Sequence, residues 1–171
     1  MAGSLILLSS TTASDDATIT ITGLDSTTYN VYVLHLIGIA PSADANFYMR
    51  VTTGGTADSD SEYDKSSVVR KSTSSGSTTT DDNTDYWRIN STVGTDTGET
   101  TNHIIHLFNF SNSSEYSMYT NESAKLTGTG SLEGYHGGGA HTVAEANNGV
   151  QFYFASGNIE SGTFNLYGLK K

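Results

Sequence analysis

The sequence of 171 residues contains no cysteine, which excludes disulfide bonds, thiolate metal sites and cysteine nucleophiles. It also lacks any run of about 20 apolar residues, the length that a membrane-spanning helix needs. The apolar run at residues 5–8 has no basic leader and is too short for the apolar region of a signal peptide. We therefore expect a protein without a signal peptide and without membrane insertion, made in the cytoplasm of its cell.

Positive charge is scarce as well. Only 8 Lys and Arg residues stand against 18 Asp and Glu residues, which gives a formal charge of −10. A negative field repels phosphate backbones, and no basic cluster interrupts it, so nucleic acid is not an expected partner. The length fits a single domain spanning residues 1–171.

The commonest pattern in the sequence is a short alternation of apolar and polar residues. Residues 17–22 read Ala-Thr-Ile-Thr-Ile-Thr, so that Ala17, Ile19 and Ile21 would face inward from a strand. Residues 47–51 and 150–154 alternate in the same way. Many short strands with polar connections predict an all-β fold, an antiparallel, jelly-roll-like β-sandwich of about eight or nine strands.

One segment is apolar on both faces. In residues 29–39, one face carries Val31, Val33 and Ile37, and the other carries Tyr32, Leu34 and Leu36. The second sheet of a sandwich can cover only one face, so a loop of the same chain or a partner must cover the other. We predict a subunit interface here, formed by Tyr32, Leu34 and Leu36.

Two other stretches are less regular. Residues 52–85 are rich in Ser, Thr and Asp, and we expect them to form a long polar loop at the surface, with at most a small strand inside it. Residues 141–147 are the one place where a helical turn is expected.

Two motifs raise the question of a metal. The stretch from His136 to His141 reads His-Gly-Gly-Gly-Ala-His, but zinc needs three or four ligands and no third one has a suitable spacing, so a glycine-rich turn is favoured. Residues 58–64 place acidic side chains at alternate positions, yet Tyr63 and Val69 stand where a calcium loop needs glycine and glutamate. We predict no metal site and no cofactor.

Catalytic motifs are absent from the sequence. No serine lies in a Gly-x-Ser-x-Gly setting and no phosphate-binding loop occurs, so we expect no enzymatic activity and assign no catalytic residue. The aromatic residues suggest a different chemistry, because ring faces and neighbouring amides are what a glycan-binding surface uses. Trp87, Tyr86 and Tyr135 are the candidate ligand-binding residues, although tyrosine is also simply common in strands.

Five segments are spread from one end of the chain to the other, at residues 5–14, 18–29, 32–42, 106–116 and 150–170. In content and order they resemble a group of β-rich bacteriophage virion proteins frequent in marine phages. The second segment begins Thr18-Ile-Thr-Ile-Thr-Gly-Leu-Asp25, and the last ends in Asn165-Leu-Tyr-Gly-Leu-Lys170. The resemblance implies a jelly-roll-like sandwich displayed on the head, tail or fibres, and often a trimer.

These expectations combine into one functional hypothesis. The chain would be a non-enzymatic virion structural protein at the particle surface, as a capsid decoration or a tail or fibre component. Its partners would be its own copies, with a homotrimer favoured, and other virion proteins. The alternative is a fibre-tip module that binds a host receptor or host surface glycan.

Overall fold

The computed structural model describes residues 4–170, which form thirteen strands and no helix. The described residues therefore include no helix of the length and apolarity that crossing a membrane would require. The strands are β1 (Leu5–Asp16), β2 (Ile19–Thr22), β3 (Tyr29–Pro41), β4 (Ala45–Thr53), β5 (Thr56–Ala57), β6 (Tyr63–Lys71), β7 (Ser77–Thr84), β8 (Trp87–Val93), β9 (Thr101–Phe108), β10 (Tyr116–Leu126), β11 (Leu132–Ala144), β12 (Gly149–Phe154) and β13 (Ile159–Lys170).

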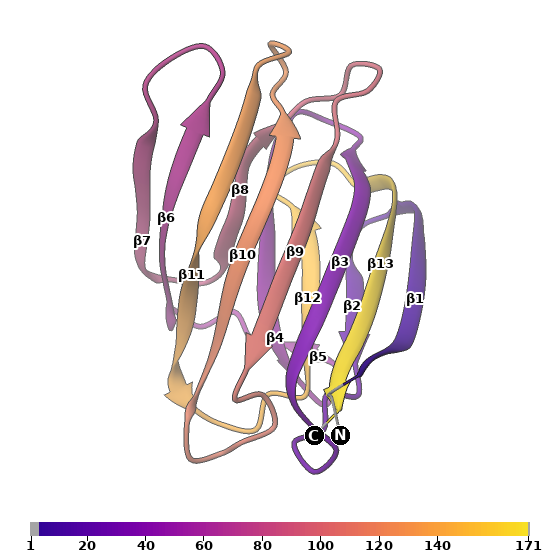
Figure 1. Cartoon of the computed structure of the whole chain (residues 1–171), viewed down its shortest axis with the longest axis vertical. Coiled ribbons are helices and arrows are strands. Elements are labelled where there is room, and N and C mark those ends of the chain that lie inside the picture. The colour runs from indigo at the N-terminus through magenta and orange to yellow at the C-terminus, as the bar shows by residue number, and fades with distance from the viewer. Residues whose placement is uncertain (1–3, 171) are drawn as a thin grey trace.

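These strands form two antiparallel sheets that lie one behind the other (Figure 1). The large sheet has the order β1-β13-β3-β9-β10-β11-β6-β7, and the small sheet has the order β2-β12-β4-β5, with β8 also paired to β4. The prediction of an all-β antiparallel sandwich is confirmed. The prediction of about eight or nine strands is too low.

The apolar core fills the space between the two sheets. The predicted inward positions of β4 and β12 are all buried, as are Ile19 and Ile21 of β2. Ala17 is exposed because it precedes β2 and lies outside the sheet. Alternation therefore identified the inner face of the small sheet.

The structure corrects the predicted subunit interface. Tyr32, Leu34 and Leu36 are at most 2% exposed and belong to the core cluster of the same chain. The small sheet already covers them, so they cannot also contact another subunit. The face of β3 left for a partner is the opposite one, where Ile37 is 54% exposed.

Residues 52–85 are also not a long loop. They contain β5, β6 and β7, and the β6–β7 hairpin extends the large sheet beyond β11. The inward side chains of β6 include Lys65 and Ser67 between Tyr63 and Val69. These polar residues break the apolar alternation, so the sequence pattern does not predict a strand here.

The glycine-rich stretch lies within β11 and is not a turn. A Cβ atom at Gly137 would lie 2.3 Å from the Ser66 carbonyl oxygen, and one at Gly139 would lie 2.9 Å from Cδ1 of Trp87. Glycine therefore lets β11 lie close to β6 and over the indole. The expected helical turn at residues 141–147 is also wrong, because β11 continues to Ala144.

Candidate functional site

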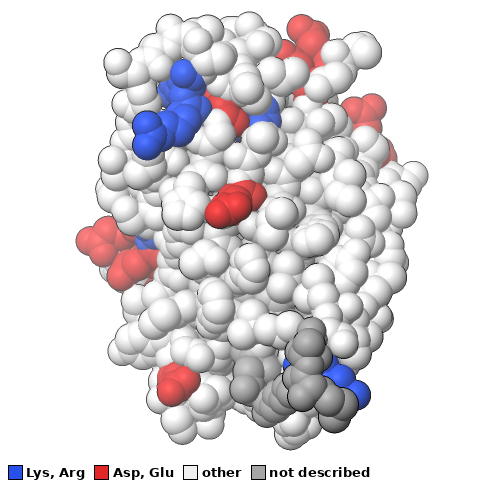
Figure 2. All heavy atoms as spheres, in the orientation of Figure 1, with Lys and Arg blue, Asp and Glu red and all other residues white. Residues whose placement is uncertain are grey.

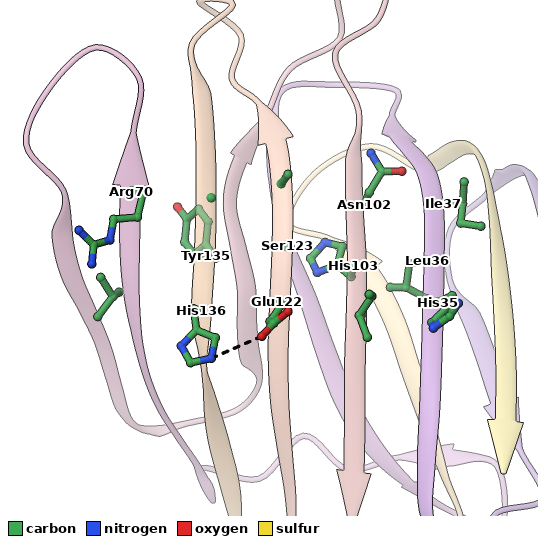
Figure 3. Close-up of a pocket in the computed structure, with 14 residues that line it drawn as sticks. His35, Leu36, Ile37, Arg70, Asn102, His103, Glu122, Ser123, Tyr135 and His136 are labelled. Atoms are coloured by element: carbon green, nitrogen blue, oxygen red, sulfur yellow. Dashed lines mark ion pairs between the residues drawn. The ribbon is translucent and has the colours of Figure 1, made fainter. Parts of the chain in front are cut away.

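The outer face of the large sheet contains a hollow of about 800 Å³ (Figure 3). Its floor is low because Ala124 of β10 and Gly134 of β11 are small and paired with each other across the two strands. Ile37 and Ile104 stand on one side of this floor and Val68 on the other, and they are 54%, 43% and 42% exposed. The hollow is thus an apolar surface open to solvent.

One row of side chains crosses this face from strand to strand. The register pairs His35 with Ile104, Ile104 with Glu122, Glu122 with His136, and His136 with Val68. His136 Nε2 lies 3.7 Å from Glu122 Oε1, and Figure 3 shows this ion pair beside the floor of the hollow. Both side chains are more than two-thirds exposed, so water screens the pair and it contributes little to stability.

The face carries little charge for so acidic a chain. Among the described residues of β3, β9, β10, β11 and β6, only Asp64, Arg70 and Glu122 are charged and point outward. One Arg and two acids sum to −1, against −10 for the whole chain. Figure 2 shows this face as mostly uncharged, with most of the acidic groups toward its margins.

The floor of small residues continues along β11. A second hollow of about 540 Å³ lies over Gly138 and Ala140, with Phe108 and Met118 beside it. Met118 is 42% exposed. Small residues of β11 thus form the floor of this hollow too, with Phe108 and Met118 on one side and Asp64, Asp81 and Asp82 on the other.

Below the face, inside the sandwich, His103 belongs to a closed polar network. Its Nδ1 lies 2.9 Å from Asn121 Oδ1, and its Nε2 lies 2.9 Å from Thr101 Oγ1. Burial lowers the pKa of His103 to about 4, so the ring is neutral at pH 7. His103 is thus bonded to its neighbours in the core, whereas His35 and His106 lie half-buried on the outer face.

The three predicted ligand-binding aromatics do not form a surface. Trp87 is fully buried and donates from Nε1 to the Ala140 carbonyl oxygen at 3.2 Å. Tyr135 is 5% exposed and faces inward toward Ser91. Only Tyr86 is partly exposed. Assigning Trp87 and Tyr135 to a glycan site is therefore wrong, because both point into the protein.

Tyr86 instead belongs to an aromatic group at the small sheet. Its ring stacks on Tyr48 at a centroid distance of 4.0 Å, and Tyr153 packs edge-on against Tyr48 at 5.4 Å. Arg50 lies over the Tyr153 ring at 4.8 Å and forms an ion pair with Asp85. The alternation in the sequence could have indicated this group, because it places Tyr48 and Tyr153 on the outward face when Phe47 and Phe152 point inward.

The two histidines of the glycine-rich stretch point to opposite faces of β11. His136 is exposed on the outer face, whereas His141 is fully buried on the inner side. They lie five positions apart, and an odd separation in a strand reverses the side-chain direction. The two rings therefore cannot bind one ion together.

Comparisons of the chain with protein-family models, with curated proteins and with solved structures found no match.

Proposed function

We propose that this chain is a non-enzymatic structural protein of a virus particle surface that assembles through the outer face of its large sheet. The assembling unit is a homotrimer that docks on neighbouring virion proteins, as a capsid decoration or a tail or fibre component. The observation that supports assembly is the broad, nearly uncharged face around Ile37, Val68 and Ile104.

Charge favours a second copy as the occupant of this face. Two chains of −10 repel each other wherever their acidic surfaces meet. Contact is least costly through a face whose charges nearly cancel, and exposed apolar patches with polar rims are typical of protein interfaces. Arg70 on one side of the hollow and Glu122 on its other side supply both signs for contacts between copies.

The proposed place on a virion rests on the resemblance to phage virion proteins. The resemblance also implies a jelly-roll fold, which the strand order supports. Strands β1, β13, β3 and β9 form one layer, and β2, β12, β4 and β8 form the other, so that chain-distant strands are neighbours in each sheet. Such an order is what a jelly roll requires. The β6–β7 and β10–β11 hairpins are additions that widen the large sheet and create its hollow face.

The proposed absence of catalysis rests on where the titratable groups lie. His103 is enclosed with Asn121 and Thr101, and His136 pairs with Glu122 on an open surface. The hydroxyl beside His103 is that of Thr101, and both residues are buried where no substrate can reach them.

Assembly is tested by sedimentation velocity and by light scattering on purified protein. Ile104→Asp should convert the oligomer to monomer, because it places a carboxylate in the contact beside Glu122. Thr20→Asp adds the same charge to the outer face of the small sheet and should leave the oligomer intact. A parent chain that stays monomeric at high concentration would overturn the proposal, and so would an Ile104→Asp variant with an unchanged oligomer.

Glycan binding is the second candidate, now placed on the Tyr48, Tyr86 and Tyr153 group. Tyrosine rings can stack on the face of a sugar ring, and the Arg50 guanidinium beside them can donate hydrogen bonds to the sugar hydroxyl groups. A glycan array should then give signals that Tyr153→Ala abolishes and that Tyr116→Ala, at an exposed tyrosine of β10, retains. An array without signals excludes this candidate.

A further inference from the structure

The pairing of β6 with β11 brings together two motifs that are far apart in the sequence. Tyr63 pairs with His141, so Glu62, one residue earlier, lies beside the buried imidazole. Thr142 binds the Glu62 carbonyl oxygen twice, from its backbone nitrogen at 2.8 Å and from its hydroxyl at 3.0 Å. Tyr63 donates from its hydroxyl to the Asp58 carbonyl oxygen at 2.9 Å. The acidic segment is therefore held in place against β11.

Three carboxylates surround His141. Its Nε2 lies 3.2 Å from Asp58 Oδ2 and 3.3 Å from Glu62 Oε2, and its Nδ1 lies 4.0 Å from Glu145 Oε1. Asp58, His141 and Glu145 offer ligand atoms that all lie within 4.8 Å of one another. The sequence argument found no third ligand for His141 because these residues become neighbours only through the sheet register.

The His141 ring has a buried nitrogen without a hydrogen-bond partner among residues 4–170, which indicates that something absent from the structure binds there. The His141 side chain is 0% exposed, and its Nε2 is a buried nitrogen that makes no hydrogen bond within the described residues despite the two nearby carboxylates. A buried polar atom without a partner costs free energy, and such atoms are rare in folded proteins. An ion placed between the nitrogen and the carboxylates would satisfy it.

The local charge has the same implication. In the described part of the chain, neither Asp58, Glu62 nor Glu145 forms an ion pair with a lysine or arginine, and His141 is the one basic group near all three. A cation would relieve the repulsion among the carboxylates.

We propose that Asp58, Glu62, His141 and Glu145 form a site for a divalent transition-metal ion, with Zn²⁺ as the ion that fits best. One imidazole nitrogen disfavours calcium and magnesium, which prefer oxygen ligands throughout. Zinc bonds of about 2.0–2.1 Å in a tetrahedron place ligand atoms about 3.3 Å apart, and His141 Nε2 lies at about this distance from Asp58 Oδ2 and from Glu62 Oε2.

A second layer of contacts can orient the ring. Zinc on Nε2 leaves the His141 proton on Nδ1, which faces the Asn147 side-chain amide at 3.3 Å. A half-turn of that amide presents its oxygen to the proton, and its other neighbours, the hydroxyls of Ser117 and Thr53, can each donate or accept. Asp58, His141 and Glu145 supply the mutually close ligand atoms, and Glu62 adds a second carboxylate beside Nε2. A metal held there would tie two connecting segments to β11 in a chain that has no cysteine for a disulfide.

The test is a zinc titration of chelator-treated protein, followed by competition with a coloured chelator and by thermal unfolding. We expect one Zn²⁺ per chain, a higher melting temperature with zinc, and a strong visible absorption when Co²⁺ takes the same four-coordinate site. Asp58→Asn combined with Glu62→Gln should lower zinc affinity by at least about a hundredfold, since each replaced ligand costs tenfold or more. Asp60→Asn, an exposed acid in the same segment, should change nothing.

Two results would overturn the proposal. The first is a parent chain that takes up no zinc and shows no shift in melting temperature. The second is zinc uptake that survives the double substitution and disappears in His136→Ala, which would place the ion on the outer face. Thermal unfolding of the metal-free proteins gives a further check. Without metal, the Asp58→Asn/Glu62→Gln variant should be at least as stable as the parent, because the substitutions remove the repulsion between carboxylates. A less stable metal-free variant would mean that contacts with His141 hold the carboxylates in place instead.

Discussion

Lys125 and Glu133 face each other directly across β10 and β11, with Lys125 Nζ 3.1 Å from Glu133 Oε2 and the Lys125 side chain fully buried. The lysine also donates to the Thr92 carbonyl oxygen. Burial alone would raise the pKa of Glu133, but hydrogen bonds from Lys71 and Lys125 outweigh it and lower that pKa. The space below the outer hollow is thus occupied by a charged pair and not by apolar side chains.

Breaking this pair should be costly. Lys125→Met leaves the Glu133 carboxylate buried with Lys71 as the one cation paired to it in the described structure, and we expect a loss of about 3–5 kcal/mol in the free energy of unfolding. Urea denaturation measures the loss. Lys71→Met, which removes the more exposed partner, should cost about 1 kcal/mol or less.

The double variant Lys125→Met/Glu133→Leu should regain most of the lost stability, because no charge is then left buried. If it is as unstable as Lys125→Met alone, the cost arises from packing and not from the unpaired carboxylate.

His103 should make the protein less stable in mild acid. Its pKa is about 4 in the folded chain against 6.5 for the free side chain, so the unfolded chain binds a proton first as the pH falls. Above pH 6.5 the ring is neutral in both states and has no effect. Between pH 6.5 and 4 it should lower the free energy of unfolding by as much as about 3 kcal/mol.

Urea denaturation at several pH values compares the parent with His103→Gln, which keeps hydrogen-bonding groups toward Asn121. The variant should lack the extra loss of stability in this pH window, even if it is less stable at pH 7. If the free energy of unfolding changes equally with pH in the two proteins, the buried imidazole accepts a proton without penalty.

The parts of the fold that could be predicted are those whose inward side chains are apolar. Ile19, Phe47 and Phe152 reveal the small sheet through alternation alone. The β6–β7 hairpin could not be predicted, because Lys65 and Ser67 interrupt the apolar side chains on the inward face of β6 and are satisfied by β7. Lys65 donates to Thr79 at 2.7 Å, a contact between strands that composition does not disclose.

The candidate sites show a similar limit. Sequence reveals that β3 is apolar on both faces, but it does not say which face meets the small sheet. The residues predicted for an interface are the ones that the small sheet covers. Nor does it reveal that His141 lies beside Asp58 and Glu62, since that proximity depends on the register of β6 against β11. Long-range register is set by packing of the whole sheet and not by local pattern.

The two faces of β3 should respond differently to truncation. Leu34 is 0% exposed in the core, so Leu34→Ala should lower the free energy of unfolding by about 2–5 kcal/mol. Ile37 is 54% exposed on the outer face, and Ile37→Ala should cost the isolated chain about 1 kcal/mol or less. Urea denaturation at low protein concentration, where assembly does not contribute, measures both. Equal costs would contradict the assignment of the two faces.

The glycines of β11 provide a final pair of matched substitutions. At Gly134 a new Cβ atom would have its nearest neighbour, the Ser123 carbonyl oxygen, at 3.7 Å, which is ordinary contact. Gly134→Ala should therefore be neutral or stabilise by up to about 1 kcal/mol, because alanine restricts the unfolded chain.

At Gly139 the same atom would lie 2.4 Å from the Asp64 carbonyl oxygen and 2.9 Å from Trp87 Cδ1. Tyr119 Cε1 would lie 2.7 Å away as well. Gly139→Ala must push β11 away from β6 or displace these two rings, and overpacking of this kind costs about 1–3 kcal/mol or more. Thermal unfolding compares the two variants, and the near-ultraviolet circular dichroism of the one tryptophan reports whether its packing has changed. A Gly139→Ala variant that melts with the parent and keeps its tryptophan signal would mean that β11 does not need glycine to lie over Trp87.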